Sequence, residues 1–434
     1  MLYPDEIVRF EPINLGRRVI WSIYAILLAI VPLLFTQSFA LTLASQTAIA
    51  IILALSYNML FGQAGMLSFG HAVYSGLGAY MAVHVLVAID KQGLAFPVTL
   101  LPLVGGIAGA FFAALFGYVT TRRSGTTFAM ISLGIGEMVF ACALMFPGFF
   151  GGEGGITANR TAGAPVLGIK GLNLGAAIQV YYVIAVWCFV ATAGMFAFTR
   201  TPLGRVANAV RDNPERVEFI GYNPVRVRYL VMIIAGFFAG IGGGLSCINY
   251  EIVNAENVGA LRSGEVLMAA FIGGAGFFFG PILGAIAYTL MAVAVGTVTK
   301  AWLLYLGLLF VLMVIFVPGG FASLILMNLR MAKYGEFRRL VPYYLALLGS
   351  VLITLTGLVA FVELIYHLSL ETGSNPEIRL GGLLINSASA RPWLISLGLL
   401  AIGGWLYAQA WAKVRHEWDD GMRVIEDKLA SSTT

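Results

Sequence analysis

Residues 200–228 read RTPLGRVANAVRDNPERVEFIGYNPVRVR and separate two long apolar segments. This stretch holds six arginines and three acidic residues. Thr201, Asn213 and Asn223 are each followed by proline. A capping residue before proline is a helix-start signal, because the missing N–H of proline costs nothing in the first turn. The stretch therefore predicts three helix starts within a charged segment.

The three starts divide the segment into short elements. Gly221 can end a helix in the left-handed conformation. We predict two short helices outside the membrane, at 202–211 and 214–220, and the beginning of the next membrane span at Pro224. This is more local order than a turn between two spans requires.

Two interpretations of the segment stay open. Its arginines can simply fix the topology of a solvated loop. Alternatively, it docks onto a cytoplasmic partner, because small apolar side chains among charges suit insertion into a groove. The apolar side chains in question are Val206, Val210, Val217, Phe219 and Ile220.

The composition sets the class of protein. The chain has 434 residues, of which 59% are hydrophobic and 11% charged, whereas a soluble domain has about a quarter charged residues. We predict an all-α polytopic membrane protein. Its three cysteines all lie in apolar segments, so no disulfide framework is expected. The basic excess comes from arginines beside spans, which indicates topology and not nucleic-acid binding.

Apolar segments predict about twelve transmembrane helices, and most are close to the ~20 residues that cross the hydrocarbon core. The segment 265–279 is short and contains glycine. The twelve segments are 19–35, 40–61, 72–89, 98–120, 127–147, 179–198, 229–249, 265–279, 281–298, 301–317, 341–365 and 393–412.

Charge orients these spans. With twelve crossings and a cytoplasmic N-terminus, seven basic residues fall outside, leaving 19 of the 26 inside. If 265–279 dipped in and returned, the basic cluster 330–339 would move outside, against the positive-inside rule. We therefore expect 265–279 to cross and both termini and 200–228 to be cytoplasmic. The seven outside residues are Lys91, Arg160, Lys170, Arg262, Lys300, Arg379 and Arg391.

Two glycine-rich stretches interrupt the spans. They are FGQAGMLSFGHAVYSGLGAY at 61–80 and FIGGAGFFFGPILGAIAY at 271–288. Broken helices occur within membranes where they line a cavity, and paired breaks are typical of internally repeated transporters. The alternative is that these glycines only permit close helix packing.

Few polar residues lie inside the predicted spans. Glu137 is near the middle of its span, where a carboxylate indicates function unless it is protonated or paired structurally. Glu265 can pair with Arg262. A lone histidine such as His71 is more often a packing or hydrogen-bonding group than a metal ligand. We find no metal-binding cluster, catalytic triad or phosphate-binding loop in the sequence.

Five segments, in order over residues 20–325, resemble the membrane permeases of branched-chain amino acid ABC importers, specifically the LivM-like subunits. In the glycine-rich outer loop 151–156 the leading threonine of the family pattern is missing. The segments are Ser56–Asn58 with Gly62–Gly65, Ser68–His71 and Gly76–Tyr80; Ser132–Gly134 with Glu137; Gly151–Ile156; Thr201–Arg205 with Arg211–Asn213 and Gly221; and Ile272–Gly274 with Gly276, Gly280–Pro281 and Gly284–Ala285.

The resemblance implies a pore-forming subunit in a bacterial cytoplasmic (inner) membrane. The implied partners are a second, LivH-like permease, two cytoplasmic ATPases and an external solute-binding protein. ATP and Mg would belong to the ATPases, so this chain would need no cofactor and would not be an enzyme.

The resemblance also assigns roles to residues. The coupling element for the ATPases would comprise Thr201, Pro202, Leu203, Gly204, Arg205, Val210, Arg211, Asp212, Asn213 and Gly221. The translocation path would include Asn58, Gln63, Gly65, Ser68, His71, Glu137, Glu265, Gly273 and Gly274.

The expected organisation follows from these segments. We expect a cytoplasmic N-terminus (1–18), a permease domain (19–325), a cytoplasmic linker (326–340), two extra spans (341–412) and a cytoplasmic tail (413–434). The last hundred residues depart from the family pattern, and we assign no role to the outer loop 366–392 or to the tail.

Two other classes compete with this interpretation. An ion-coupled secondary transporter also has twelve spans, but a charged loop usually follows its second span. Here that position reads GQAGMLSFGH, without acidic or strongly basic residues. A passive channel would leave the helices of 200–228 without a role. The sequence leaves the solute open among Leu, Ile, Val, urea, short amides and aromatic acids.

Overall fold

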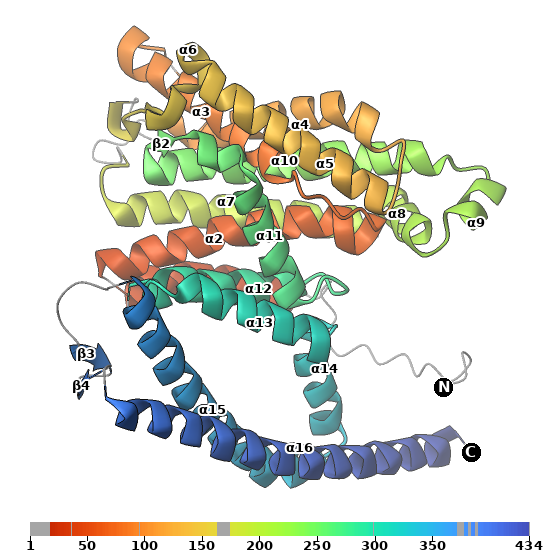
Figure 1. The fold of residues 1–434 in the computed structure, drawn as a ribbon. Coiled ribbons are helices and arrows are strands. Elements are labelled where there is room, and N and C mark those ends of the chain that lie inside the picture. Colours follow the sequence, from red (N-terminus) through yellow and green to blue (C-terminus); the bar gives the residue numbers. More distant parts are fainter. Residues whose placement is uncertain are drawn as a thin grey trace. The chain divides into compact units, whose positions relative to one another are not determined.

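The computed structural model describes residues 18–35, 37–94, 96–162, 174–297, 299–370, 377–380, 383–386 and 389–433. These residues are almost entirely helical, with two short antiparallel strand pairs (Figure 1). Their contacts define two compact units. The main unit contains 14–298 and 305–323, and the C-terminal unit contains 299–304 and 324–434. The first 17 residues, Lys170 and parts of the predicted loop 366–392 lie outside the described residues.

The main unit holds most of the apolar helices. Its principal helices are α1 (Arg18–Leu34), α2 (Ser38–Asn58) with the π-helical turn η2 (Met59–Gln63), α3 (Ala72–Gln92), α4 (Leu101–Thr120), α5 (Thr126–Met145), α7 (Ala177–Arg200), α8 (Pro202–Asp212), α9 (Pro214–Phe219), α10 (Pro224–Tyr250), α11 (Ala260–Gly273), α12 (Gly280–Thr289) with the π-helical turn η8 (Leu290–Val295), and α13 (Trp302–Phe316).

Shorter elements connect these helices. They are η3 (Val98–Leu100), α6 (Pro147–Phe150), η4 (Gly152–Gly154), β1 (Ile156–Thr157), η5 (Arg160–Ala162), β2 (Ile252–Val253) and η7 (Ala255–Val258). Strand β1 pairs antiparallel with β2, with Ile156 opposite Val253.

Each of the twelve apolar segments lies largely on a helix, which confirms the all-α membrane class. In the described chain, eight helices are long and apolar enough to cross a membrane, or nine if α13 and α14 (Gly320–Lys333) form one bent span. Helix α1 and the α12–η8 pair are apolar but shorter, and α11 has 14 residues. Helix length alone therefore supports fewer crossings than the predicted twelve.

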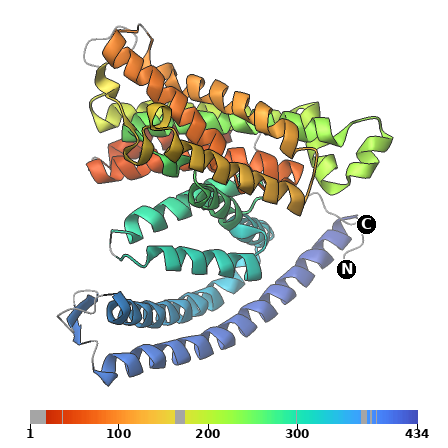
Figure 2. The ribbon, with the colours of Figure 1, turned by 45° about the horizontal axis from the view of Figure 1, so that its top comes forward.

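Helix α10 forms the centre of the main unit, where it packs against α2, α3 and α4. Its close approach to α4 depends on glycine, because a Cβ at Gly240 would overlap the carbonyl oxygen of Gly105. Small residues permit such backbone contact between helices in lipid. At one end of α10, helices α8 and α9 lie together (Figures 1 and 2), and β2 lies at the opposite end (Figure 1).

The C-terminal unit is built on a helical hairpin. Helices α15 (Phe337–Leu370) and α16 (Ala390–Thr433) pack against each other, and β3 (Glu377–Leu380) pairs with β4 (Leu383–Asn386) between them. Residues 326–340 carry the end of α14 and the start of α15. The expected tail continues α16, whose Ile425 is buried with Met331 and Leu340.

Candidate functional site

The arginine-rich segment forms the helices that its sequence predicts. The side-chain oxygens of Thr201, Asn213 and Asn223 each accept hydrogen bonds from backbone N–H groups two or three residues later, at 3.0–3.2 Å. These bonds cap α8, α9 and α10, each of which has proline in its first turn. Gly221 has a φ of 88°, as its helix-ending role requires.

The expectation that five apolar side chains of this segment serve a partner needs correction. Val210 and Val217 are each only 1% exposed, so they pack within this chain, and Val206 is half-buried. Phe219 is 90% exposed and Ile220 67%. Of the five side chains, only these two offer a large apolar surface, at the end of α9.

The remaining predicted coupling residues divide by burial. Gly204 is buried, and Leu203 and Asn213 are half-buried. Those that are exposed are Thr201, Pro202, Arg205, Arg211, Asp212 and Gly221.

Arg211 joins this segment to the first glycine-rich stretch. Its Nη1 donates a hydrogen bond to the carbonyl oxygen of Gly62. Its aliphatic stem covers Gly65, where an added Cβ would lie 2.9 Å from Arg211 Cγ. Arg211 also pairs with Asp212 at 2.9 Å. The predicted coupling element and translocation path therefore touch at this arginine.

The first glycine-rich stretch is a broken helix. Helix α2 ends in the π-helical turn η2, and 65–70 is not helical before α3 begins at Ala72. Two serine hydroxyls satisfy backbone groups there. The N–H of Phe69 donates to Ser132 on α5, and the N–H of Ala72 donates to Ser263 on α11, each at 3.0 Å. Because unpaired backbone groups are costly within lipid, these bonds hold the break against both helices.

The second stretch is broken as well, and it meets the first. Gly274 has a φ of 105° and separates α11 from α12. A Cβ at Gly62 would overlap both Asn58 Oδ1 and the carbonyl oxygen of Ala275. The ring centroids of Phe61 and Phe271 lie 4.6 Å apart. The prediction of two helix breaks is confirmed, and the breaks are in contact.

Most predicted path residues are buried around the two helix breaks. Asn58, Gln63, Ser68 and His71 are buried, and His71 Nε2 lies 2.9 Å from Ser56 Oγ. Gly273 and Gly274 are buried, whereas Gly65 is exposed. Within the described chain, Asn58 Oδ1, Gln63 Oε1, Ser68 Oγ and His71 Nδ1 have no hydrogen-bond partner. Buried polar atoms of this kind favour a polar neighbour or water.

The other two predicted path residues, Glu137 and Glu265, line one cavity of about 560 Å³. Glu265 Oε2 pairs with Arg262 Nη1 at 2.6 Å, which confirms the predicted ion pair. Glu137 is exposed on α5 and has no hydrogen-bond or ion-pair partner among the described residues. The cavity lies between α5, α11 and the connection that joins α10 to α11.

The end of α10 and that connection supply residues that sequence reasoning missed. Tyr250, Asn254, Glu256 and Asn257 all line the cavity. The polar cluster NAEN at 254–257, directly after an apolar span, was the available signal.

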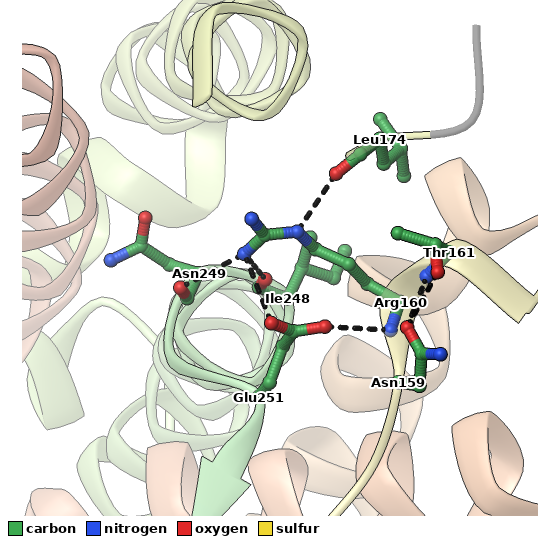
Figure 3. A network of polar contacts seen from close by, with 7 residues as sticks. All are labelled: Asn159, Arg160, Thr161, Leu174, Ile248, Asn249 and Glu251. Carbon is green, nitrogen blue, oxygen red and sulfur yellow. Dashed lines mark hydrogen bonds and ion pairs between the residues drawn. The ribbon is translucent and has the colours of Figure 1, made fainter. Parts of the chain in front are cut away.

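A polar network holds the start of this connection (Figure 3). Arg160 donates from Nε to the carbonyl oxygen of Leu174 at 2.8 Å and from Nη1 to those of Ile248 and Asn249 at 3.2 and 3.3 Å. The backbone N–H of Arg160 donates to Glu251 Oε1 at 2.9 Å, and the two side chains pair at 3.6 Å.

Glu251 is unusual because its φ of 56° lies in the left-handed region, which non-glycine residues rarely adopt. It ends α10 and directly precedes β2. The Arg160 network therefore fixes the direction in which the chain leaves α10 and enters the cavity wall.

These features define a multi-pass helical membrane protein with a helical, arginine-rich loop at one end and a charged cavity toward the other. Within the described ranges, no group of three or more His, Cys, Asp or Glu side chains is placed to hold a metal ion.

A family model described as "Branched-chain amino acid transport system / permease component" matches residues 39–318. The chain belongs to this family. The match lies before α15 and α16, so it does not include the helical hairpin of the C-terminal unit.

Three relatives are similar to this chain. LivM, a high-affinity branched-chain amino acid permease protein of Escherichia coli K12, is 29% identical over 296 residues, covering 64% of this chain and 68% of LivM. LivH of Salmonella typhimurium is 24% identical over 54% of this chain and 77% of LivH. The fructose import permease FrcC of Rhizobium meliloti is 25% identical over 64% of this chain and 78% of FrcC. No solved structure gives a significant match.

Proposed function

We propose that this chain is a permease subunit of an ABC importer that moves branched-chain amino acids into the cell. Family membership and the similarity to LivM support this assignment. The similarity to a fructose permease means that sequence similarity alone does not select the solute. The ion-coupled alternative gains no support from these relatives.

The proposed orientation places α8 and α9 in the cytoplasm and the cavity toward the outer side of an inner membrane, with both termini inside. The arginines of 200–228 support this orientation through the positive-inside rule. Two cytoplasmic ATPases, which bind ATP and Mg, would dock at α8 and α9. An external solute-binding protein would deliver the solute.

A second permease is also proposed. Glu137 lies on an exposed face of α5 within a predicted span, and a carboxylate facing lipid is costly. Coverage of this face by a sister permease would remove that cost and enclose the cavity. The similarity to LivH as well as to LivM fits a pair of related permeases.

The contact from Arg211 to Gly62 carries the proposed coupling mechanism. Movement of α8 would pull on the π-helical end of α2 and on the break that follows it. Ser132 and Ser263 bond the far side of that break to α5 and α11. Because these helices form two walls of the cavity, displacement at α8 would change the cavity.

The docking step can be tested with the exposed apolar tip of α9. We expect the double variant Phe219→Ser, Ile220→Ser to lose ATPase subunits during purification of the assembled complex. The matched control is Val119→Ser, because Val119 is 57% exposed near the end of α4 and outside this segment. Full retention of ATPases by the double variant would contradict docking at α9.

A further inference from the structure

The cavity between α5, α11 and the 250–259 connection has the dimensions of a ligand site. Its volume of about 560 Å³ falls within the ~300–1,000 Å³ that is typical of small-molecule pockets. Its lining includes both charged and apolar side chains, so the chemistry of the lining indicates which class of ligand fits.

The charges of the lining favour a ligand with a cationic group. Glu137, Glu256 and Glu265 line the cavity together with a single cation, Arg262. Arg262 and Glu265 neutralise each other at 2.6 Å. Glu137 and Glu256 have no ion-pair partner within the described chain. Glu137 lies in a helix long enough to span the membrane, where a carboxylate is stabilised by an opposite charge, and a transported ammonium group supplies one. Glu256 is an exposed residue of η7 and adds a second acid to the same lining.

The same cavity has a place for a carboxylate. A guanidinium has five N–H donors, and the described chain engages Arg262 only through the bond to Glu265. The apolar part of the lining comes from Phe140, Ile252 and Leu261. This surface suits an aliphatic side chain, whereas a sugar would leave it without an apolar partner.

We propose that this cavity binds aliphatic α-amino acids as zwitterions, with the ammonium group at Glu137 and Glu256 and the carboxylate at Arg262. The proposal rests on the permease function above and assigns the residues that would recognise its solute within the membrane. Urea and fructose lack the charged groups that these side chains recognise. The site therefore adds selectivity within the membrane, after any selection by a binding protein.

Protection of an introduced cysteine measures this binding directly. Leu261→Cys places a thiol on the exposed rim of the cavity, in a chain where Cys142→Ser removes the half-buried native cysteine. The full-length chain, in membranes without ATP or binding protein, is treated with a maleimide. We expect L-leucine to slow labelling, and L-leucinamide, 4-methylpentanoate and urea to protect only at concentrations at least about tenfold higher, because each lacks one or both charges.

Variants of the two acidic side chains test whether each contributes to leucine binding. Glu137→Gln and Glu256→Gln should each raise the leucine concentration needed for protection by about tenfold or more. Glu153→Gln, which removes an exposed acid outside the lining, should leave it unchanged. Two variants are used so that a folding defect in one does not decide the result.

The outcomes distinguish failure of the cavity assignment from failure of the proposed importer function. Absence of protection by leucine, or equal protection by leucine and 4-methylpentanoate, would overturn the cavity assignment even if ATP-dependent uptake is observed. Protection by leucine in a chain that supports no ATP-dependent uptake would instead retain the cavity and reject the importer.

Discussion

Arg211 on α8 donates a hydrogen bond to the backbone carbonyl oxygen of Gly62, 149 residues earlier in the sequence. Gly62 lies in the π-helical end of α2, where helix carbonyls lack their usual partners. A charged donor satisfies this carbonyl more strongly than a neutral one. The contact therefore fixes the charged loop to the point at which a membrane helix breaks.

The orientation of the loop gives the first prediction. We expect Glu215→Cys on the exposed surface of α9 to react with a membrane-impermeant maleimide in inside-out vesicles but not in intact cells. Glu153→Cys, near the opposite end of the main unit, should show the reverse pattern. Labelling of Glu215→Cys in intact, sealed cells would contradict the cytoplasmic placement.

The contact between the two helix breaks gives the second prediction. Gly62→Ala should impair uptake, because the added Cβ would overlap Asn58 and Ala275. Gly134→Ala is the control, since its Cβ meets nothing within 4 Å in α5, and alanine favours a helix over glycine by roughly 0.5–1 kcal/mol. Uptake and thermal stability are measured for both. Normal uptake by Gly62→Ala would show that the close contact is dispensable.

The features that were predicted correctly from the sequence depend on residues close together in the chain. The caps at Thr201, Asn213 and Asn223 depend on residues only two or three positions apart. The pairing of Arg262 with Glu265 likewise depends on helix periodicity, because residues three apart share a face. The glycine-rich breaks were visible because glycine interrupts an otherwise continuous apolar pattern.

Long-range contacts were not predictable in this way. Arg160 and Glu251 are 91 residues apart, and no local pattern indicates that they meet. In the sequence, Val210 and Val217 are apolar side chains that suit a partner's groove. In the structure both are buried, because the apolar faces of α8 and α9 pack against this chain. The cavity wall at 250–259 was missed because its polar residues resemble an ordinary loop.

The left-handed backbone at Glu251 gives the third prediction. Glu251→Ala loses the Arg160 contacts and keeps the unfavourable φ, whereas Glu251→Gly loses the same contacts but relieves the strain of ~1–2 kcal/mol. We expect the glycine variant to be more stable than the alanine variant by about 1 kcal/mol, measured by thermal unfolding of the purified protein. Equal stability of the two variants would show that this backbone conformation stores no strain.

The ion pair in the cavity gives the fourth prediction. Arg262→Met or Glu265→Leu alone leaves one partly buried charge without its partner and should destabilise the protein by about 1–3 kcal/mol. The double variant should lose less than the sum of the single losses, because no charge is then left unpaired. Additive losses in thermal unfolding would show that the two side chains contribute independently.

We propose that Arg211 transmits force from the ATPases to the broken helix. The most direct test is the number of solute molecules imported per ATP hydrolysed by the complete complex in proteoliposomes. For Arg211→Gln we expect ATP hydrolysis to continue while uptake per ATP falls by about tenfold, since a charged hydrogen bond contributes roughly 1.5–3 kcal/mol. Arg123→Gln, which removes an exposed arginine near the end of α4, should match the unmodified complex. An unchanged ratio in Arg211→Gln would show that Arg211 does not transmit this force.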